Sequence, residues 1–255
     1  MRTLKSQLPE DSVESLAREV IRRLAKRDGT LTVNSPSDEV IERLCDVLLS
    51  DDDHAGADFI QKIEADGATI EVVYLEYLAR AARMLGLWWE EDKISFMSVT
   101  LGTSRMFAIM RGLNGRFSAS QSTQKRKALF ASVPGETHTL GVRLAADLFR
   151  RDGWEIGLKL GASHDELVES VEASDAVLIG LSAAGQHSIA ALSQLVVALR
   201  ISKPSAKIIV SGNSAVVAAE TVLLLGVDGI AQDVQAARFL MNNLWNETSG
   251  AASQS

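Results

Sequence analysis

Cysteine is nearly absent from this sequence, and so are the long apolar runs that a membrane protein needs. The single cysteine among 255 residues is Cys45, which excludes an intramolecular disulfide and any metal site built from several thiolates. It lies at an apolar position of a helical pattern, which predicts a buried side chain. No apolar run approaches the roughly 18 residues of a transmembrane helix, and the N-terminus lacks the apolar core of a secretory signal. We therefore expect a cytoplasmic protein with no membrane partner.

Positively charged residues are fewer than negatively charged ones. The chain has 26 Lys and Arg against 33 Asp and Glu, which makes its net charge −7. Such a balance argues against a protein that holds nucleic acid with its whole surface. A local basic patch leaves direct DNA contact open, but we do not favour it. Hydrophobic residues make up 46% of the sequence and charged ones 23%, which is ordinary for a globular protein, and the length suits two domains.

Several motifs that would identify an enzyme are missing. The sequence has no GxxxxGK[ST] loop to hold phosphates and no GxGxxG after the first strand that we expect in its C-terminal half. The third expected strand ends in Leu181-Ser182, where a phosphoacceptor domain needs an aspartate. GxSxG, HExxH and CxxC are absent too. These absences argue against nucleotide hydrolysis, phosphorelay and simple hydrolases.

The N-terminal half has helical periodicity throughout. Apolar residues including Val13, Val20 and Leu24 predict an amphipathic helix within residues 1–36. Beyond it, the pattern predicts helices over 38–49, 54–66, 69–87 and 95–113, interrupted at 50–53, at Gly67 and at 88–93. Four helices with short connections indicate a bundle over residues 37–113.

The C-terminal half alternates between strand and helix patterns. Residues 114–126 are rich in Ser and Gln and predict a linker. The α/β domain then covers 127–245, and residues 246–255 form a tail that we expect to be disordered. Expected strands are 128–133, 154–160, 176–181, 207–210 and 229–231, and expected helices are 138–151, 165–173, 189–199, 215–225 and 234–244. This alternation predicts a doubly wound, five-stranded parallel sheet of the flavodoxin-like or Rossmann-like class.

One turn of this domain carries a histidine at a place where α/β proteins bind ligands. Residues 134–141 read Pro-Gly-Glu-Thr-His-Thr-Leu-Gly and put His138 directly after the first strand. In open α/β sheets the ligand crevice lies outside the carboxyl ends of the strands. The third strand ends at Ser182, and the fourth is followed by Ser211-Gly212. We therefore expect these three turns to meet at one site.

Together the three turns resemble the cobalamin-binding domain, whose pattern is DxHxxG, then a serine, then GG. Here Glu136 to Gly141 read ExHxLG, with Glu136 in place of the family's aspartate. The resemblance implies that His138 replaces the cofactor's own benzimidazole as lower ligand of cobalt, for which an imidazole is a suitable donor. It implies that Glu136 accepts a hydrogen bond from the other ring nitrogen and so sets the tautomer.

The resemblance also implies a place for the cofactor's displaced nucleotide tail. That tail lies between the sheet and its helices in the family, and small residues leave room for it. The small residues of this chain that correspond are Gly141, Gly180, Ala183, Ala184, Gly185 and Gly212. The resemblance also implies that Ser182 hydrogen-bonds the displaced base, with Ser211 beside Gly212 in the third turn of the site. His187, six residues past the third strand, is the other histidine that could reach the edge of the cofactor.

The resemblance extends to the helical half, where related proteins place a bundle over the upper face of the corrin. A tryptophan lies over the sixth position of the metal in that family, and Trp88 and Trp89 are the candidates, with Trp88 slightly favoured. Light-sensing repressors of the CarH kind have Glu-His nine residues after this tryptophan, which this chain lacks, and a longer N-terminal region. The chain instead looks most like the AerR/PpaA group of antirepressors.

These features imply a cobalamin-binding sensor, responsive to light, that regulates transcription through a partner repressor and is not an enzyme. The cofactor could be adenosyl-, methyl- or hydroxocobalamin, and homo-oligomerisation is left open. The alternative from another class is a corrinoid carrier of a methyltransferase system, which would share the fold and His138. Another tetrapyrrole, such as haem, is less favoured because His138 is present.

Overall fold

The computed structural model of the chain describes residues 35–114, 126–185 and 188–252. The described residues from Glu39 onward belong to one compact unit. The amphipathic helix expected within residues 1–36 lies outside the described residues, except for its last two positions. Within the part of the chain that the structure describes, no helix is both long and apolar enough to cross a membrane.

The helical half begins with α2 (Asp38–Leu49) and α3 (Ala55–Ala65). The buried residues of α2 are Ile41, Leu44, Cys45 and Leu48, spaced three and four apart as an amphipathic helix requires. Cys45 is fully buried, as predicted, and its Sγ lies 3.6 Å from the carbonyl oxygen of Ala81. Burial raises the pKa of its thiol to about 12, so it is not a reactive thiolate at neutral pH.

The next helix is one continuous rod made of α4 (Ile70–Val72), the π-helical segment η1 (Val73–Leu78) and α5 (Ala79–Glu90). It begins at Thr69, whose side chain accepts a hydrogen bond from the Val72 amide. A break over residues 88–93 was predicted, and this was wrong at its start, because the helix runs through Glu90. Trp88 and Trp89 therefore lie on α5. After a short turn, α6 (Phe96–Asn114) completes the bundle.

The C-terminal half contains five parallel strands in the order β2-β1-β3-β4-β5. They are β1 (Arg126–Ser132), β2 (Trp154–Lys159), β3 (Leu178–Ser182), β4 (Lys207–Ser211) and β5 (Gly229–Ala231). This order confirms the predicted doubly wound sheet of flavodoxin-like topology. The chain reverses its winding direction between β1 and β3, so the crevice for a ligand is expected at the carboxyl ends of these two strands.

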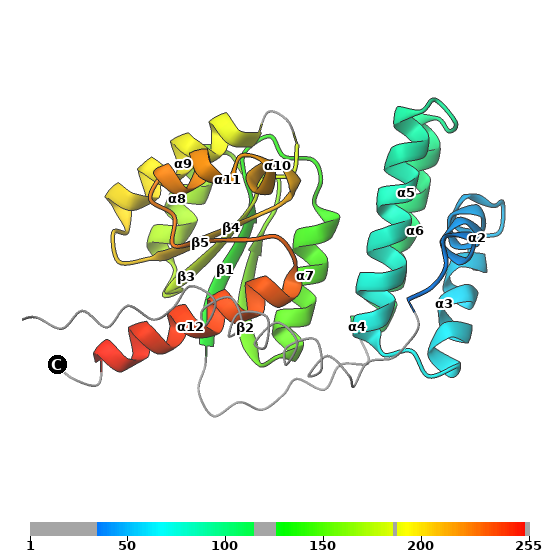
Figure 1. The fold of residues 1–255 in the computed structure, drawn as a ribbon, viewed down its shortest axis with the longest axis horizontal. Coiled ribbons are helices and arrows are strands. Elements are labelled where there is room, and N and C mark those ends of the chain that lie inside the picture. The colour runs from blue at the N-terminus through cyan, green and yellow to red at the C-terminus, as the bar shows by residue number, and fades with distance from the viewer. Residues whose placement is uncertain (1–34, 115–125, 186–187, 253–255) are drawn as a thin grey trace, which may run out of the picture. The chain divides into compact units, whose positions relative to one another are not determined.

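Helices cover both faces of the sheet (Figure 1). On one face, α7 (Leu140–Arg151) and α12 (Val234–Ala252) pack on Phe130, Leu178 and Ile209. On the other face, α8 (His164–Ala173) and α9 (Ser188–Ser202) pack on the alternate strand residues, such as Ile179 and Ile208. Since both faces are buried, the inner strands β1, β3 and β4 contain continuous apolar runs, whereas the edge strand β2 alternates between buried and exposed residues.

Three further differences from the prediction concern the C-terminal tail, the linker and one helix. Helix α12 continues to Ala252, so the prediction of a disordered tail from residue 246 was wrong over residues 246–252. The ring of Trp245 packs on that of Trp154 with centroids 5.8 Å apart, and a helix anchored in this way extends at little cost through polar residues. The ends of the expected linker belong to α6 and β1, while residues 115–125 lie outside the described residues.

The third difference concerns the helix predicted over 215–225. The structure has two short helices there, α10 (Asn213–Val217) and α11 (Ala219–Leu224). Ala218 separates them with φ −98° and ψ 29°, which is outside the helical region. The apolar spacing continues across this residue, and for that reason periodicity alone predicted one helix.

Candidate functional site

The loop after β1 carries the predicted histidine and turns tightly before α7. Gly135 has φ +78°, a left-handed conformation that glycine adopts without strain. The Glu136 amide donates to the Val133 carbonyl at 3.0 Å, which closes the turn. The Val133 amide in turn donates to the carbonyl of Ser182 at 3.1 Å. The loop is therefore tied to the end of β3 at the switch point of the sheet.

Glu136 is a buried carboxylate that joins two loops. Its side chain is only 1% exposed. One oxygen, Oε1, accepts from both the backbone amide and the Nδ1 of His138, each at 2.7 Å. The other, Oε2, accepts from the amides of Ala184 and Gly185 at 2.8 and 2.7 Å and from the Ser188 hydroxyl at 2.6 Å. The carboxylate thus connects the loop after β1 to the loop after β3 and the start of α9.

Glu136 is ionised despite its burial. Burial alone would raise the pKa of this carboxyl group, but the hydrogen bonds from Ser188, Gly185 and His138 outweigh it and lower the pKa to about 2. Donors that surround a carboxylate favour its charged form. The site therefore holds one fixed negative charge directly behind His138.

The hydrogen bond to Glu136 determines which ring nitrogen of His138 carries the proton. An ionised carboxylate can only accept, so Nδ1 of His138 carries the proton. In the neutral ring the lone pair is then on Nε2, and the side chain is 68% exposed. The described residues contain no group of three or more His, Cys, Asp or Glu that could enclose a metal ion. The arrangement suits a metal that brings its other ligands with it and takes one imidazole from the protein.

Three serines align across the carboxyl ends of the strands. Ser132 of β1 is in register with Ser182 of β3, and Ser182 is in register with Ser211 of β4. By alternation along the strands, these side chains share the face of Phe130 and Gly180, the face that α7 and α12 cover. Ser132 accepts from the amide of Gly161 at 3.3 Å, and Ser182 is buried, with 6% exposed.

The predicted glycines serve different purposes. A Cβ atom on Gly141 would meet nothing within 4 Å, so the start of α7 borders open space. A Cβ on Gly185 would lie 3.4 Å from Oε2 of Glu136. Gly212 has φ +104°, and a Cβ there would lie 2.5 Å from the carbonyl oxygen of Ala183. Gly185 and Gly212 therefore allow the close approach of the loops, and Gly141 leaves room beside His138.

The two tryptophans of α5 differ in their surroundings. Trp88 is partly buried and packs against the core of the bundle. Trp89 is 46% exposed, and its ring lies 6.1 Å from that of Phe96. Trp89 is therefore the more exposed of the two indoles, whereas the resemblance slightly favoured Trp88 as the residue over the metal. His187 lies outside the described residues.

Sequence reasoning did not identify Ser188 or the amide of Ala184 as partners of Glu136. Both are about 50 residues away from Glu136 in the chain, and only the parallel pairing of β1 with β3 brings them close to it. The signal that could have found them is the small-residue stretch that follows β3. Such a stretch predicts exposed backbone amides at the carboxyl edge of a sheet, where they can bind an anion.

Comparison with known proteins agrees with this geometry. Residues 126–237 match the family model described as B12 binding domain. A relative from Rhodobacter capsulatus, described as an uncharacterized 20.5 kDa protein in the bchF-crtJ intergenic region, is 26% identical over 170 residues. The match covers 65% of this chain and 88% of the relative.

A solved structure shares the fold over most of its length. It is the monomethylamine corrinoid protein of Methanosarcina barkeri, with a TM-score of 0.65 at 16% identity. The superposition covers 81% of this chain and 99% of that protein. At this identity the likeness is one of fold, and it includes the order of a helical region followed by an all-parallel sheet.

Proposed function

We propose that this chain, whose α/β domain is a B12 binding domain, is a cobalamin sensor that regulates transcription through a partner repressor, with light as the signal. The cofactor is supported by the family match. The regulatory role rests on the resemblance to the AerR/PpaA group and on the Rhodobacter relative. Its partner is a protein rather than DNA, in keeping with the net charge of −7.

In this proposal Nε2 of His138 would hold the cobalt of bound cobalamin. The observation that carries it is the buried, ionised Glu136, which holds Nδ1 at 2.7 Å and leaves Nε2 exposed. Bound cobalamin supplies a six-coordinate metal and, in its alkyl forms, a light-sensitive cobalt–carbon bond. Orientation of a ligating imidazole by a carboxylate raises its basicity and fixes its direction.

The proposal also assigns roles to the other residues that we predicted to bind the cofactor. Ser182, Ser211, Gly185 and Gly212 lie at the ends of β3 and β4, where the nucleotide tail would enter between the sheet and its helices. Gly141 provides open space at the start of α7. A tryptophan of α5 would contact the upper ligand, so that the contacts of the bundle differ when that ligand is present or lost. A signal requires such a difference between two states.

The test is absorption spectroscopy of the full chain purified in the dark. We would add adenosylcobalamin or hydroxocobalamin, remove free cofactor, and record spectra before and after green light. We expect a retained corrin spectrum that light changes in the adenosyl form, and loss of retention in His138→Ala. The matched control is His54→Ala, because His54 is exposed and its side chain caps nothing. A corrin spectrum that is equally retained by His138→Ala would refute the ligand assignment.

The corrinoid carrier is the second candidate, since a carrier would share the fold and His138. The similarity of fold to a corrinoid protein is the observation that keeps it in consideration. We would load the protein with methylcobalamin and measure methyl transfer to a thiol acceptor in the dark. Transfer without any spectral response to light would favour the carrier over the sensor.

A further inference from the structure

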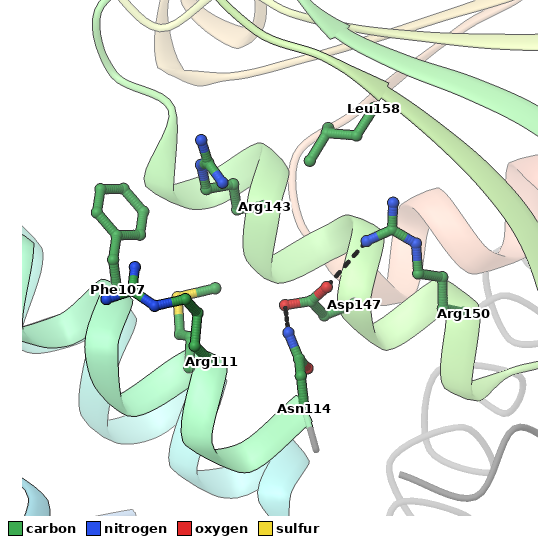
Figure 2. Close-up of a pocket in the computed structure, with 8 residues that line it drawn as sticks. Phe107, Arg111, Asn114, Arg143, Asp147, Arg150 and Leu158 are labelled. Carbon is green, nitrogen blue, oxygen red and sulfur yellow. Dashed lines mark hydrogen bonds and ion pairs between the residues drawn. The ribbon is translucent and has the colours of Figure 1, made fainter. Parts of the chain in front are cut away.

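A cavity between α6 and α7 is lined by several positively charged side chains. Its volume is about 260 Å³. Phe107, Met110 and Arg111 of α6 line one side, and Arg143 and Arg150 of α7 line the other (Figure 2). Neither His138 nor Glu136 is part of its lining. The lining therefore includes neither the predicted cobalt ligand nor the carboxylate behind it.

Asp147 is the one carboxylate among the residues that line this cavity, and both of its oxygens accept hydrogen bonds. Asp147 is buried, with 8% exposed. Its Oδ2 accepts from Asn114 at 2.8 Å and its Oδ1 from Arg150 at 3.1 Å. Figure 2 marks both of these interactions. Asn114 is itself held by the hydroxyl of Tyr74, which donates to Oδ1 of Asn114 at 3.2 Å. Asp147 is thus committed to Asn114 and Arg150.

Among the described residues, two guanidinium groups of the cavity, those of Arg111 and Arg143, have no counter-ion. The guanidinium of Arg143 lies over the ring of Phe107, 5.0 Å from its centroid. This contact uses its face and leaves the N–H groups at its edge available. Within residues 35–114, 126–185 and 188–252, neither Arg111 nor Arg143 has a carboxylate partner. A locally positive cavity in a chain whose net charge is −7 favours the binding of an anion.

The shape and the walls of the cavity restrict that anion further. The planar fork of arginine suits the oxygens of phosphate or carboxylate in bidentate pairs. Phe107, Met110 and Leu158 add an apolar wall beside the two arginines. The volume of about 260 Å³ is slightly below the range of roughly 300–1,000 Å³ for drug-sized ligands, so the cavity suits a smaller molecule.

We propose that this cavity binds a small phosphate monoester, with the phosphate against Arg111 and Arg143 and the organic part against Phe107, Met110 and Leu158. Because Arg111 is on α6 of the bundle and Arg143 is on α7 of the α/β domain, the ligand stabilises the contact between these helices. A ligand that binds only the folded, docked arrangement raises its stability in proportion to ln(1 + [L]/Kd). None of the lining residues is one that we assign to cobalamin, so the site can be tested in cofactor-free protein.

The experiment is calorimetric titration of the full chain with phenyl phosphate, inorganic phosphate and hexaglutamate. We expect phenyl phosphate to bind more tightly than inorganic phosphate, and the affinity to fall at least about tenfold in Arg111→Gln/Arg143→Gln. The matched control is Arg43→Gln/Arg83→Gln, which removes two exposed arginines of α2 and α5 and should bind as the wild type does. His138→Ala should also bind as the wild type does, which separates this test from that of the cobalamin site.

The proposal fails if phenyl phosphate does not bind, or if the cavity variant binds it as tightly as the control. Inorganic phosphate bound as tightly as phenyl phosphate would show that the apolar wall has no part, and would overturn the assignment to a monoester. Hexaglutamate that binds more tightly than phenyl phosphate, and only when Arg111 and Arg143 are present, would identify the cavity as a contact for an acidic protein segment instead. Thermal melts with and without ligand would confirm that each variant is folded.

Discussion

A single oxygen of Glu136, Oε1, accepts hydrogen bonds from both the backbone amide and the Nδ1 of His138, each at 2.7 Å. The contact sets both the position of the loop and the tautomer of the ring. The second oxygen is held by three donors from the loop after β3 and the start of α9. Loss of the charge on Glu136 should therefore affect the stability of the fold as well as the site.

The first prediction concerns the pH dependence of stability in cofactor-free protein. The pKa of Glu136 is about 2 in the folded state against 4.5 when unperturbed. Because the pKa of Glu136 is lower in the folded than in the unfolded state, its ionised carboxylate stabilises the fold above pH 4.5. This stabilisation is lost as the pH falls towards 2. The shift corresponds to about 3 kcal/mol, at about 1.36 kcal/mol per unit. Urea denaturation of the wild type and of Glu136→Gln at pH 7, 4 and 2.5 measures this contribution.

Glu136→Gln should be less stable than the wild type by about 2 kcal/mol at pH 7, because an amide nitrogen replaces an acceptor among buried donors. The difference between the two proteins should shrink as the pH falls. Glu172→Gln on α8 is the control, since Glu172 is exposed and should show no such convergence. A constant difference across this pH range would contradict the ionised, hydrogen-bonded state of Glu136.

The second prediction separates the two tryptophans of α5. Trp88→Ala should lower the free energy of unfolding by about 2–3 kcal/mol, because Trp88 packs on the bundle core. Trp89→Ala should cost less than about 1 kcal/mol, since its ring is 46% exposed. If Trp89 contacts the upper ligand as proposed, its loss should change the rate of the light-induced spectral change while cobalamin is still retained. An unchanged rate in Trp89→Ala would leave Trp88 as the capping residue.

The third prediction uses two glycines of the site that differ in their surroundings. Gly212→Ala should lower stability by at least about 2 kcal/mol, because it combines φ +104° with a Cβ 2.5 Å from a carbonyl oxygen. Gly141→Ala should leave stability equal or raise it by up to about 1 kcal/mol, since the added methyl group meets open space in a helix.

The same Gly141→Ala variant tests the cofactor site. If the open space at the start of α7 is filled by bound cobalamin, the methyl group should weaken cobalamin binding about tenfold, since overpacking costs about 1–3 kcal/mol. Equilibrium dialysis of both proteins against cyanocobalamin measures this. Unchanged affinity together with unchanged stability would place the cofactor away from Gly141.

The fourth prediction concerns an ion-pair network that includes both halves of the described chain. Arg238 of α12 pairs with Asp152, Nε to Oδ2 at 2.6 Å, and with Glu71 of α4, Nη1 to Oε1 at 2.5 Å. Burial by itself would lower the pKa of Arg238, but its hydrogen bonds to Glu71 and Asp152 raise it. A double-mutant cycle of Glu71→Gln and Arg238→Met should give a coupling energy of about 1–2 kcal/mol. A coupling near zero in denaturation curves would show that the pair adds no stability.

Much of the fold could be predicted from the sequence because its elements are strongly periodic. The boundaries of α2 and β5 agree with the prediction, and so does the parallel sheet. The errors fall where local pattern and tertiary contact disagree. Polar residues after Leu244 predicted a disordered tail, but Trp245 packs on Trp154 and α12 continues. The apolar spacing on both sides of Ala218 predicted one helix, but its backbone divides the segment in two.

The candidate site could be predicted in part. The His138 turn and the serines after β3 and β4 follow from where strands end in the sequence. The three donors from Ala184, Gly185 and Ser188 do not, because they come from segments that only the β1–β3 pairing brings close to Glu136.

By itself, the sequence determined which residues end each strand, and hence that His138, Ser182 and Ser211 lie at one edge of a parallel sheet. Alternation of apolar runs with helical patterns is sufficient for this, since it depends only on local periodicity. The tertiary structure alone decided the burial and ionisation of Glu136, which of Trp88 and Trp89 is more exposed, and the charge in the cavity between α6 and α7. Each of these depends on distances between residues far apart in the chain, and no local pattern contains them.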